Sequence, residues 1–136
     1  MNRWARAFVV AASAVWLAGT LAVAQEKGGN PEAAKVKNPV VRSPESIQAG
    51  QDSYMKFCRG CHARDAAGGP PAEAGEEPAS NLIDDQWNHG STDGEIFKVI
   101  KDGIAPALVM EGFGRRLTET DIWNVVNYLR SIAVKK

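Results

Sequence analysis

The sequence predicts an all-α fold of about three main helices connected by long loops. Apolar residues recur with the three- and four-residue spacing of an amphipathic helix in three separate stretches. Each of these stretches begins with a Ser or Thr that can cap a helix. No stretch alternates apolar and polar residues as a half-buried strand does, and no internal repeat is present. These observations favour helices throughout the folded part of the chain.

The first segment, residues 1–24, has the layout of a secretory signal. Two arginines precede an apolar, alanine-rich run that ends in the small-x-small pattern Ala22-Val23-Ala24. We therefore expect cleavage before Gln25 and export. A retained membrane anchor is the alternative, but a spanning helix needs about 20 strongly apolar residues, and this run is shorter.

The next segment, residues 25–42, is rich in Gly, Asn, Pro and Lys and has almost no large apolar residue. Such a composition buries too little surface to order itself, so it predicts a flexible leader. The remaining residues, 43–136, form one small domain. A core of that size usually needs a disulfide, a metal or a buried cofactor to support it.

The first helix of the domain is expected to begin at Ser43. Its hydroxyl can serve as the N-cap, Pro44 suits the first helical position, and Glu45 faces the positive end of the helix dipole. Apolar and small residues then recur at helical spacing up to Phe57. Residues 63–80 are rich in Gly, Pro and Glu and predict a long loop. A loop of that length in a compact domain is normally either disordered or wrapped around something.

Two further helices follow. The second begins at Thr92, with Glu95 in capping-box register, and ends at Gly103. The third begins at Thr118, with Asp121 at its third position, and has the clearest apolar stripe of the chain. A short helix is also expected around residues 82–86.

The only two cysteines, Cys58 and Cys61, belong to the segment Cys-Arg-Gly-Cys-His that ends at His62. In this C-x-x-C-H pattern both thiols form thioethers with haem vinyl groups, and the imidazole binds iron. Two cysteines three apart on a helical turn reach two vinyl groups on one edge of the ring, while the adjacent histidine faces the metal. The sequence therefore predicts one covalently bound haem c.

A structural disulfide, a thioredoxin-type redox pair and a zinc site are the alternatives. A thioredoxin-type pair needs strands on either side, and the sequence predicts none. Zinc normally takes four ligands, whereas the chain has only two Cys and two His residues, and His89 is badly spaced from His62.

A six-coordinate iron needs one more ligand from the opposite face of the ring. One of the three methionines leaves with the signal, and Met55 lies just before the cysteines, too close to cross the ring. Met110 remains, in the irregular stretch 103–117, where a loop could present its sulfur to iron. Two alternatives stay open: Met110 fills the core, or His89 is the sixth ligand.

Residues 43–133 resemble a class I monohaem cytochrome c, particularly the small bacterial periplasmic ones. Three segments carry the resemblance, in addition to the C-x-x-C-H motif. They are Ala49–Tyr54, Gly103–Gly114 and Leu117–Trp123, the last leading to Tyr128-Leu129-Arg130. The resemblance implies a cytochrome c fold with His62 and Met110 as axial ligands, and a crossing of the first and last helices at Gly50 against Tyr128.

The resemblance also implies a wider haem site. The carbonyl of Pro70 would accept the second imidazole hydrogen of His62. Leu82 and Trp87 would line the haem, with the Trp87 indole donating to a propionate or simply packing. Many family members have proline directly after the ligand methionine, and here Glu111 follows Met110. This departure concerns the shape of the loop more than the identity of the ligand.

A haem with both axial positions filled has no open site for a substrate, so it passes electrons on. We therefore expect an electron carrier and not an enzyme, acting freely or as the cytochrome subunit of a respiratory or dehydrogenase complex. Its partners would be redox proteins such as a dehydrogenase, an oxidase or another cytochrome, with no stable membrane insertion after signal cleavage. The alternative is a haem enzyme or ligand sensor with a labile sixth ligand.

Charge patterning excludes one class of partner. The chain has 16 basic and 16 acidic residues, and the basic ones are scattered, so no nucleic-acid partner is implied. Four basic residues could surround a haem edge and dock an acidic partner, or they could be an ordinary solvated face. These are Lys98, Lys101, Arg115 and Arg116.

Overall fold

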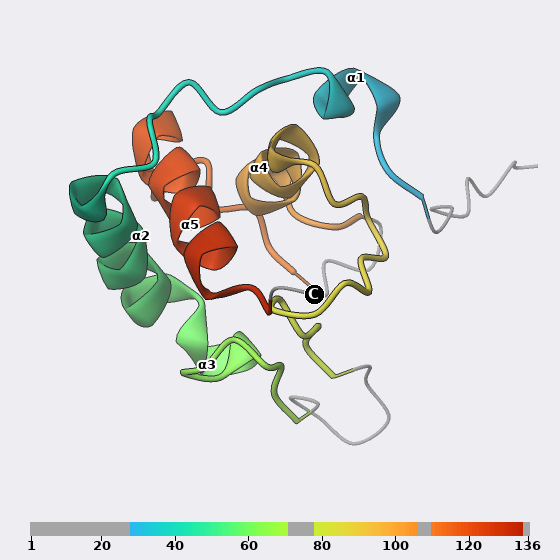
Figure 1. Ribbon diagram of the computed structural model, residues 1–136. Coiled ribbons are helices and arrows are strands. Elements are labelled where there is room, and N and C mark those ends of the chain that lie inside the picture. Colours follow the sequence, from blue (N-terminus) through green and yellow to red (C-terminus); the bar gives the residue numbers. More distant parts are fainter. Residues whose placement is uncertain (1–27, 71–77, 106–109, 135–136) are drawn as a thin grey trace, which may run out of the picture.

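The structure is a computed structural model that describes residues 28–70, 78–105 and 110–134. In these ranges it contains five helices and no strand, which confirms the predicted all-α class. The helices are α1 (Pro31–Ala34), α2 (Pro44–Phe57), α3 (Arg59–His62), α4 (Asp93–Asp102) and α5 (Glu119–Ile132). Figure 1 shows α2 and α5 crossing side by side, with α4 packed against α5 and α3 at the end of α2.

The three main helices begin at the residues that the sequence predicted. Each N-cap hydroxyl accepts a hydrogen bond from the backbone three residues on, and the side chain at that position bonds back to the N-cap backbone. The three pairs are Ser43 with Ser46, Thr92 with Glu95, and Thr118 with Asp121. Helix α4 ends at Gly103, whose φ of 79° is a conformation that favours glycine.

The core is built around the crossing of α2 and α5. A Cβ atom added at Gly50 would lie 1.9 Å from the backbone oxygen of Asn124 and 2.9 Å from Cβ of Tyr128. Only glycine allows the two backbones to come this close. One turn later, the rings of Tyr54 and Tyr128 pack with their centroids 5.3 Å apart. The predicted crossing at Gly50 against Tyr128 is therefore confirmed.

The segment before α2 differs from the prediction of a flexible leader. Asn30 caps the short helix α1, in which Ala33 is buried with 7% of its surface exposed. Further on, Asn38 donates to the backbone oxygen of Trp123 and to the side chain of Asn127. This segment has few apolar side chains to bury, and it is ordered instead by amide and backbone hydrogen bonds. We call residues 28–42 the N-terminal strap; Figure 1 shows it passing over α4 and α5 on its way to α2.

The stretch 82–86 also differs from its prediction, because it consists of bends and not of a short helix. The side-chain oxygen of Asn81 accepts hydrogen bonds from the backbone of Ile83 and Asp84, and this local turn competes with helix formation. The long loop predicted over residues 63–80 is irregular where it is described, and residues 71–77 lie outside the described ranges.

No helix in the described ranges is long and apolar enough to cross a membrane. The expected signal segment, residues 1–24, lies outside those ranges, as do the first residues of the expected leader, 25–27.

Candidate haem site

The C-x-x-C-H segment forms a helical turn of its own. Cys58 ends α2, its amide donating to the Tyr54 carbonyl, and the same residue is the N-cap of α3. The amides of Cys61 and His62 then donate to the Cys58 carbonyl at 3.2 and 3.0 Å. Both cysteines are free thiols; Cys58 is partly buried and Cys61 is exposed. This places the two thiols three residues apart on one turn, as thioether attachment requires.

Hydrogen bonds from Tyr54 connect this turn to α2. The Tyr54 hydroxyl, on a fully buried side chain, donates to the Ala63 carbonyl at 2.7 Å and lies 3.3 Å from the His62 carbonyl. Burial, followed by the nearby Cys58, raises the pKa of Tyr54 far above its usual value, so the hydroxyl remains a donor. Ala63 itself leaves the turn in the left-handed region, with φ 63°. The tyrosine therefore determines where the chain goes after His62.

The imidazole of His62 is oriented by a backbone carbonyl. Its Nδ1 lies 3.0 Å from the carbonyl oxygen of Ser80. When Nδ1 carries the hydrogen and donates to this oxygen, Nε2 is left as the nitrogen with a free lone pair, which is the arrangement of a metal-ligating histidine.

The acceptor differs from the one expected at Pro70. A Cβ added at Gly69 would lie 2.1 Å from the Cys61 carbonyl oxygen, and the Gly68 amide donates to the His62 carbonyl. The start of the loop therefore packs against the backbone of the turn. The end of the loop, at Ser80, contacts the imidazole ring of His62. The neighbouring Pro71, part of the same expected segment, lies outside the described residues.

The thiols are not arranged as a reactive redox pair. Burial, and then the nearby Cys61, raises the pKa of the Cys58 thiol to about 11, so it is protonated at neutral pH. A thioredoxin-type nucleophile has the opposite shift, towards an accessible thiolate. In the described ranges no three His, Cys, Asp or Glu side chains are grouped closely enough to hold a metal ion.

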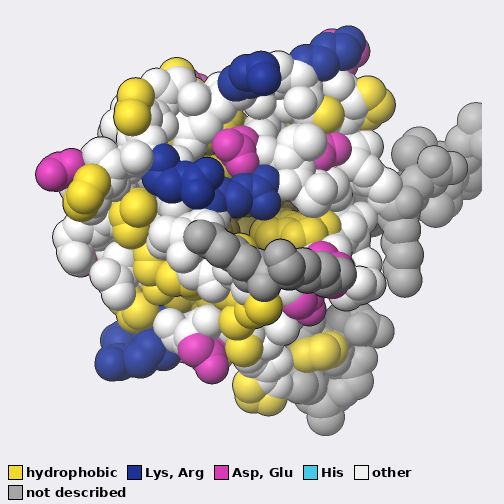
Figure 2. Space-filling view, in the orientation of Figure 1, with side chains coloured by type: hydrophobic (Ala, Val, Ile, Leu, Met, Phe, Trp, Pro, Cys, Tyr) yellow, Lys and Arg dark blue, Asp and Glu magenta, His cyan; other side chains and the backbone are white. Residues whose placement is uncertain are grey.

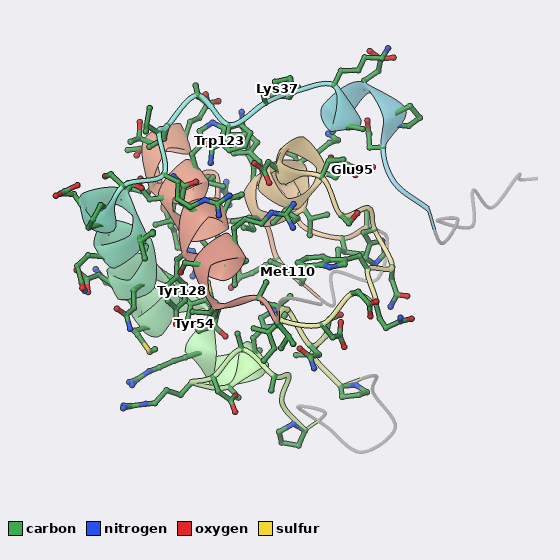
Figure 3. The ribbon with its side chains drawn as sticks, viewed as in Figure 1. Lys37, Tyr54, Glu95, Met110, Trp123 and Tyr128 are labelled. Carbon is green, nitrogen blue, oxygen red and sulfur yellow. The ribbon has the colours of Figure 1, made fainter. Side chains whose placement is uncertain are left out.

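Met110 is partly buried and packs against the core. Its backbone oxygen accepts a hydrogen bond from Ile104 at 2.9 Å, and Glu111 forms an isolated bridge with Gly103. The loop that carries Met110 is thus closed at its base against the end of α4; residues 106–109 within it lie outside the described ranges. Figure 3 shows Met110 in the middle of the molecule. Its packing is compatible both with a ligand role and with core filling.

The other expected residues lie in different surroundings. Leu82 and Trp87 are partly buried against the core, as haem-lining residues would be. The Trp87 indole already donates to the Asp84 carbonyl at 3.2 Å, so it has a partner within the chain and the propionate role stays a prediction. Met55 lies on α2 and also packs against the core, while His89 is partly buried in the turn before α4.

The four basic residues considered for docking are mostly neutralised. Lys98 pairs with Asp102, Lys101 with Glu119, and Arg116 with Glu111. Arg115 is the member of the group that has no ion pair among the described residues. The pairing favours the interpretation of this group as a solvated face.

Sequence reasoning missed two contributors, Tyr54 and Ser80. Tyr54 could have been found, because an aromatic residue stands one helical turn before Cys58 on the buried side of a predicted helix. Ser80 acts through its backbone carbonyl, which every residue has, so no side-chain signal marks it.

The donor set fits a covalently attached haem. Two unpaired thiols lie on one turn, the imidazole Nδ1 is occupied, and Cys58 packs against the hydrophobic core. Figure 2 shows hydrophobic side chains gathered in the middle of the face that is seen in Figure 1. The partly buried apolar residues that pack against the core include Phe57, Leu82, Ile83, Trp87 and Met110.

Solved structures that share this fold include a cytochrome and a chain of a protein complex. Cytochrome cL from the marine methylotrophic bacterium Methylophaga aminisulfidivorans is 26% identical, with a TM-score of 0.57 over 67% of this chain and 55% of that one. A chain of the reducing HAO-like protein complex of Kuenenia stuttgartiensis is 20% identical, with a TM-score of 0.60 over 73% of this chain and 50% of that one. The chain thus spans about half the length of either structure. No curated protein matches it.

A family model described as "Cytochrome C oxidase, cbb3-type, subunit III" matches residues 45–129. This range is more than half of the chain and includes nearly all of α2 and α5, together with the C-x-x-C-H turn and α4. The match, the all-helical fold and the pair of free thiols agree with one another. The chain therefore belongs to this family of cytochrome c domains, whose members are typically haem-based electron carriers rather than enzymes.

Proposed function

We propose that this protein transfers single electrons through one haem c, bound covalently to Cys58 and Cys61, with His62 and Met110 as axial ligands. The observation that carries the proposal is the His62 ring, whose Nδ1 lies 3.0 Å from the Ser80 carbonyl while the two thiols lie on the same turn. Bound in this way, the haem would supply a one-electron redox centre.

Each residue of the chain has a separate task in this proposal. The two thiols hold one edge of the ring, and Tyr54 holds the turn that carries them. The Ser80 carbonyl keeps the imidazole in one tautomer and makes Nε2 a better donor. The Met110 thioether stabilises ferrous iron relative to a second imidazole, so we expect a comparatively high reduction potential.

Met110 is supported as the second ligand by its position relative to the other methionine. Met55 lies on α2, three residues before Cys58 and therefore on the attachment side of the ring. Met110 comes from a separate loop closed against the end of α4, and it faces the interior. A loop of this kind can approach the iron from the side opposite to His62.

The axial assignment is tested by comparing Met110→Ala with Met55→Leu in the purified holoprotein. Met110→Ala should abolish the weak long-wavelength charge-transfer band that a thioether–iron bond gives in the ferric protein, lower the potential, and open a site for carbon monoxide. Met55→Leu should change none of these properties.

Two other results would replace the assignment. A spectrum that Met110→Ala leaves intact but His89→Ala alters would indicate a bis-histidine site. Carbon monoxide uptake by the wild type, with neither variant changing the spectrum, would indicate the ligand-binding alternative.

Covalent attachment has its own test. Acid–acetone extraction should leave the haem on the wild-type chain, and a pyridine haemochrome spectrum should identify it as c-type. The double variant Cys58→Ala with Cys61→Ala should lose covalent haem and fail to fold, because a domain this small lacks a sufficient core without the ring. Haem that extracts freely from the wild type would contradict the proposal.

We further propose that the protein is exported to the bacterial periplasm, and that it exchanges electrons with redox protein partners as a free carrier or as a subunit of a complex. The signal-like segment 1–24 supports export. One relative of the same fold belongs to a multi-protein complex, which supports the second role. Mass spectrometry should find Gln25 at the mature N-terminus, and the size of the gently extracted native species distinguishes carrier from subunit.

A further inference from the structure

Glu95 lies where the N-terminal strap meets the first turn of α4. Its carboxylate accepts hydrogen bonds from the Thr92 amide at 3.0 Å and the Thr92 hydroxyl at 2.7 Å, and only 6% of the residue is exposed. The strap covers it: a Cβ added at Gly29 would lie 1.8 Å from Oε1 of Glu95. Figure 3 shows Glu95 at the end of α4 that faces α1. A carboxylate therefore joins the strap to the helix.

The strap and α4 are in close backbone contact beside this carboxylate. A Cβ added at Gly94 would lie 2.0 Å from the Ala33 carbonyl oxygen and 2.6 Å from that of Val36. The Gly28 amide also donates to the Asn88 carbonyl, in the chain that leads into α4. The strap residues of these contacts, Gly28, Ala33 and Val36, precede residues 45–129, the range of the family match.

The charge on Glu95 is stabilised in this position. Burial raises its pKa, but hydrogen bonds from the backbone and side chain of Thr92, and from the backbone of Asn30 and Ser91, together lower it below its usual value. Asn30 belongs to the strap, so the strap contributes directly to holding the anion. On the other side, Arg130 of α5 binds Asp93 at 2.8 Å, which fixes the same end of α4 to α5.

The opposite end of α4 holds the loop of Met110. The Phe113 amide donates to the Ile100 carbonyl at 2.8 Å, and the Gly114 amide donates to the Lys101 carbonyl at 3.0 Å. The Ile104 amide closes the loop onto the Met110 carbonyl. A ten-residue helix is a stiff rod of about 15 Å, so a shift at its first turn is carried to its last.

We propose that Glu95 is a positioning residue: by clasping the strap to the first turn of α4, it sets the place of that helix and hence of the Met110 loop at its other end. This rests on the proposed ligation of iron by Met110. The strap is accordingly part of the electron-transfer domain, since it helps to hold the sixth ligand on the iron.

The chain offers a matched comparison in α5. Its capping box has the same hydrogen bonds, with the Thr118 amide and hydroxyl donating to Asp121 at 3.0 and 2.6 Å. That box is solvent-exposed at Thr118, and no strap residue contributes to it. Removing either carboxylate would therefore weaken the capping of its helix. Only the removal of Glu95 should loosen Met110.

The test uses the full-length holoprotein and added imidazole, which competes with Met110 for ferric iron. Binding is measured at a temperature where every variant is fully folded. Glu95→Ala should raise the apparent affinity about tenfold, because loosening the ligand by 1.4 kcal/mol corresponds to that factor. Asp121→Ala should change the affinity by less than about twofold on the same scale. Amide hydrogen exchange should rise across the strap only in the Glu95 variant.

Equal imidazole affinities in the two variants would overturn the proposal. An unchanged imidazole affinity in Glu95→Ala would also overturn it if amide hydrogen exchange shows that the strap is released. If Glu95→Ala yields no folded holoprotein, Glu95→Gln replaces it, with a smaller effect of the same sign expected. Met110→Ala is titrated in parallel. If Met110→Ala does not raise the imidazole affinity, the ligation by Met110 is refuted, and the positioning role of Glu95 is refuted with it. If Met110→Ala does raise the affinity, the result for the Glu95 variant tests the positioning role by itself.

Discussion

The Tyr54 hydroxyl donates to the Ala63 carbonyl oxygen across 2.7 Å, and this bond joins α2 to the chain that leaves the C-x-x-C-H turn. Tyr54 lies one helical turn after Gly50, where α2 crosses α5. The same face of one helix therefore fixes both the packing of the core and the position of His62. A substitution at Gly50 or at Tyr54 should therefore disturb both the helix crossing and the position of His62.

Replacing Tyr54 with Phe should lower the free energy of unfolding of the holoprotein by about 1–2 kcal/mol, because the change leaves a buried carbonyl without its donor. Guanidinium unfolding measures the effect. Tyr128→Phe is the matched control, since its ring packs against Tyr54 but its hydroxyl has no hydrogen-bond partner among the described residues. Equal losses in both variants would mean that the hydrogen bond from the Tyr54 hydroxyl does not stabilise the turn.

Adding a methyl group at Gly50 should destabilise the fold by about 1–3 kcal/mol, because the new Cβ meets the Asn124 backbone at 1.9 Å and the helices must separate. Gly60→Ala is the control: it lies in α3, and nothing stands within 4 Å of its added Cβ. That change should be neutral or stabilise by up to about 1 kcal/mol through helix propensity. Thermal unfolding that treats both glycines alike would contradict the close crossing.

Asn124→Ala should stabilise the protein by about 0.5–1 kcal/mol. The side-chain oxygen of Asn124 is buried and has no hydrogen-bond partner among the described residues, so its removal ends a desolvation penalty and improves helix propensity. Asn127→Ala, three residues on, should instead cost about 2 kcal/mol, because it breaks bonds to the Val40 carbonyl and the Ser46 hydroxyl. Urea unfolding of the pair checks the opposite signs, and a loss of stability in both would refute the first assignment.

The contribution of Glu95 to stability should depend on pH. Its pKa in the folded protein lies below the usual 4.5, so its stabilisation is fully present above that pH and is lost as the pH falls through the lowered pKa. Glu95→Gln should therefore be less stable than the wild type at pH 7, and the difference should narrow in acid below pH 4.5. A difference in unfolding free energy that stays constant from neutral to acid pH would contradict this prediction.

Features that depend on neighbours in the chain were predictable. A capping box such as Thr92 with Glu95 acts across three residues, and the C-x-x-C-H turn places its thiols and imidazole through the local geometry of one helical turn. The close crossing at Gly50 was expected from a family resemblance, and the structure confirms it. The amino-acid sequence by itself thus determined the helix starts, the C-x-x-C-H motif and the family.

The remaining features depend on where distant segments meet. Pro70 and Ser80 have identical backbone carbonyls, so the path of the loop alone decides which one reaches the His62 ring. The strap looked unable to order itself because it has few apolar side chains, yet Asn38 bonds to Asn127, 89 residues away, and Glu95 lies beneath Gly29. Amino-acid composition does not reveal which hydrogen-bonding groups stabilise a fold. Each group contributes only when tertiary packing brings its partner within reach and excludes water.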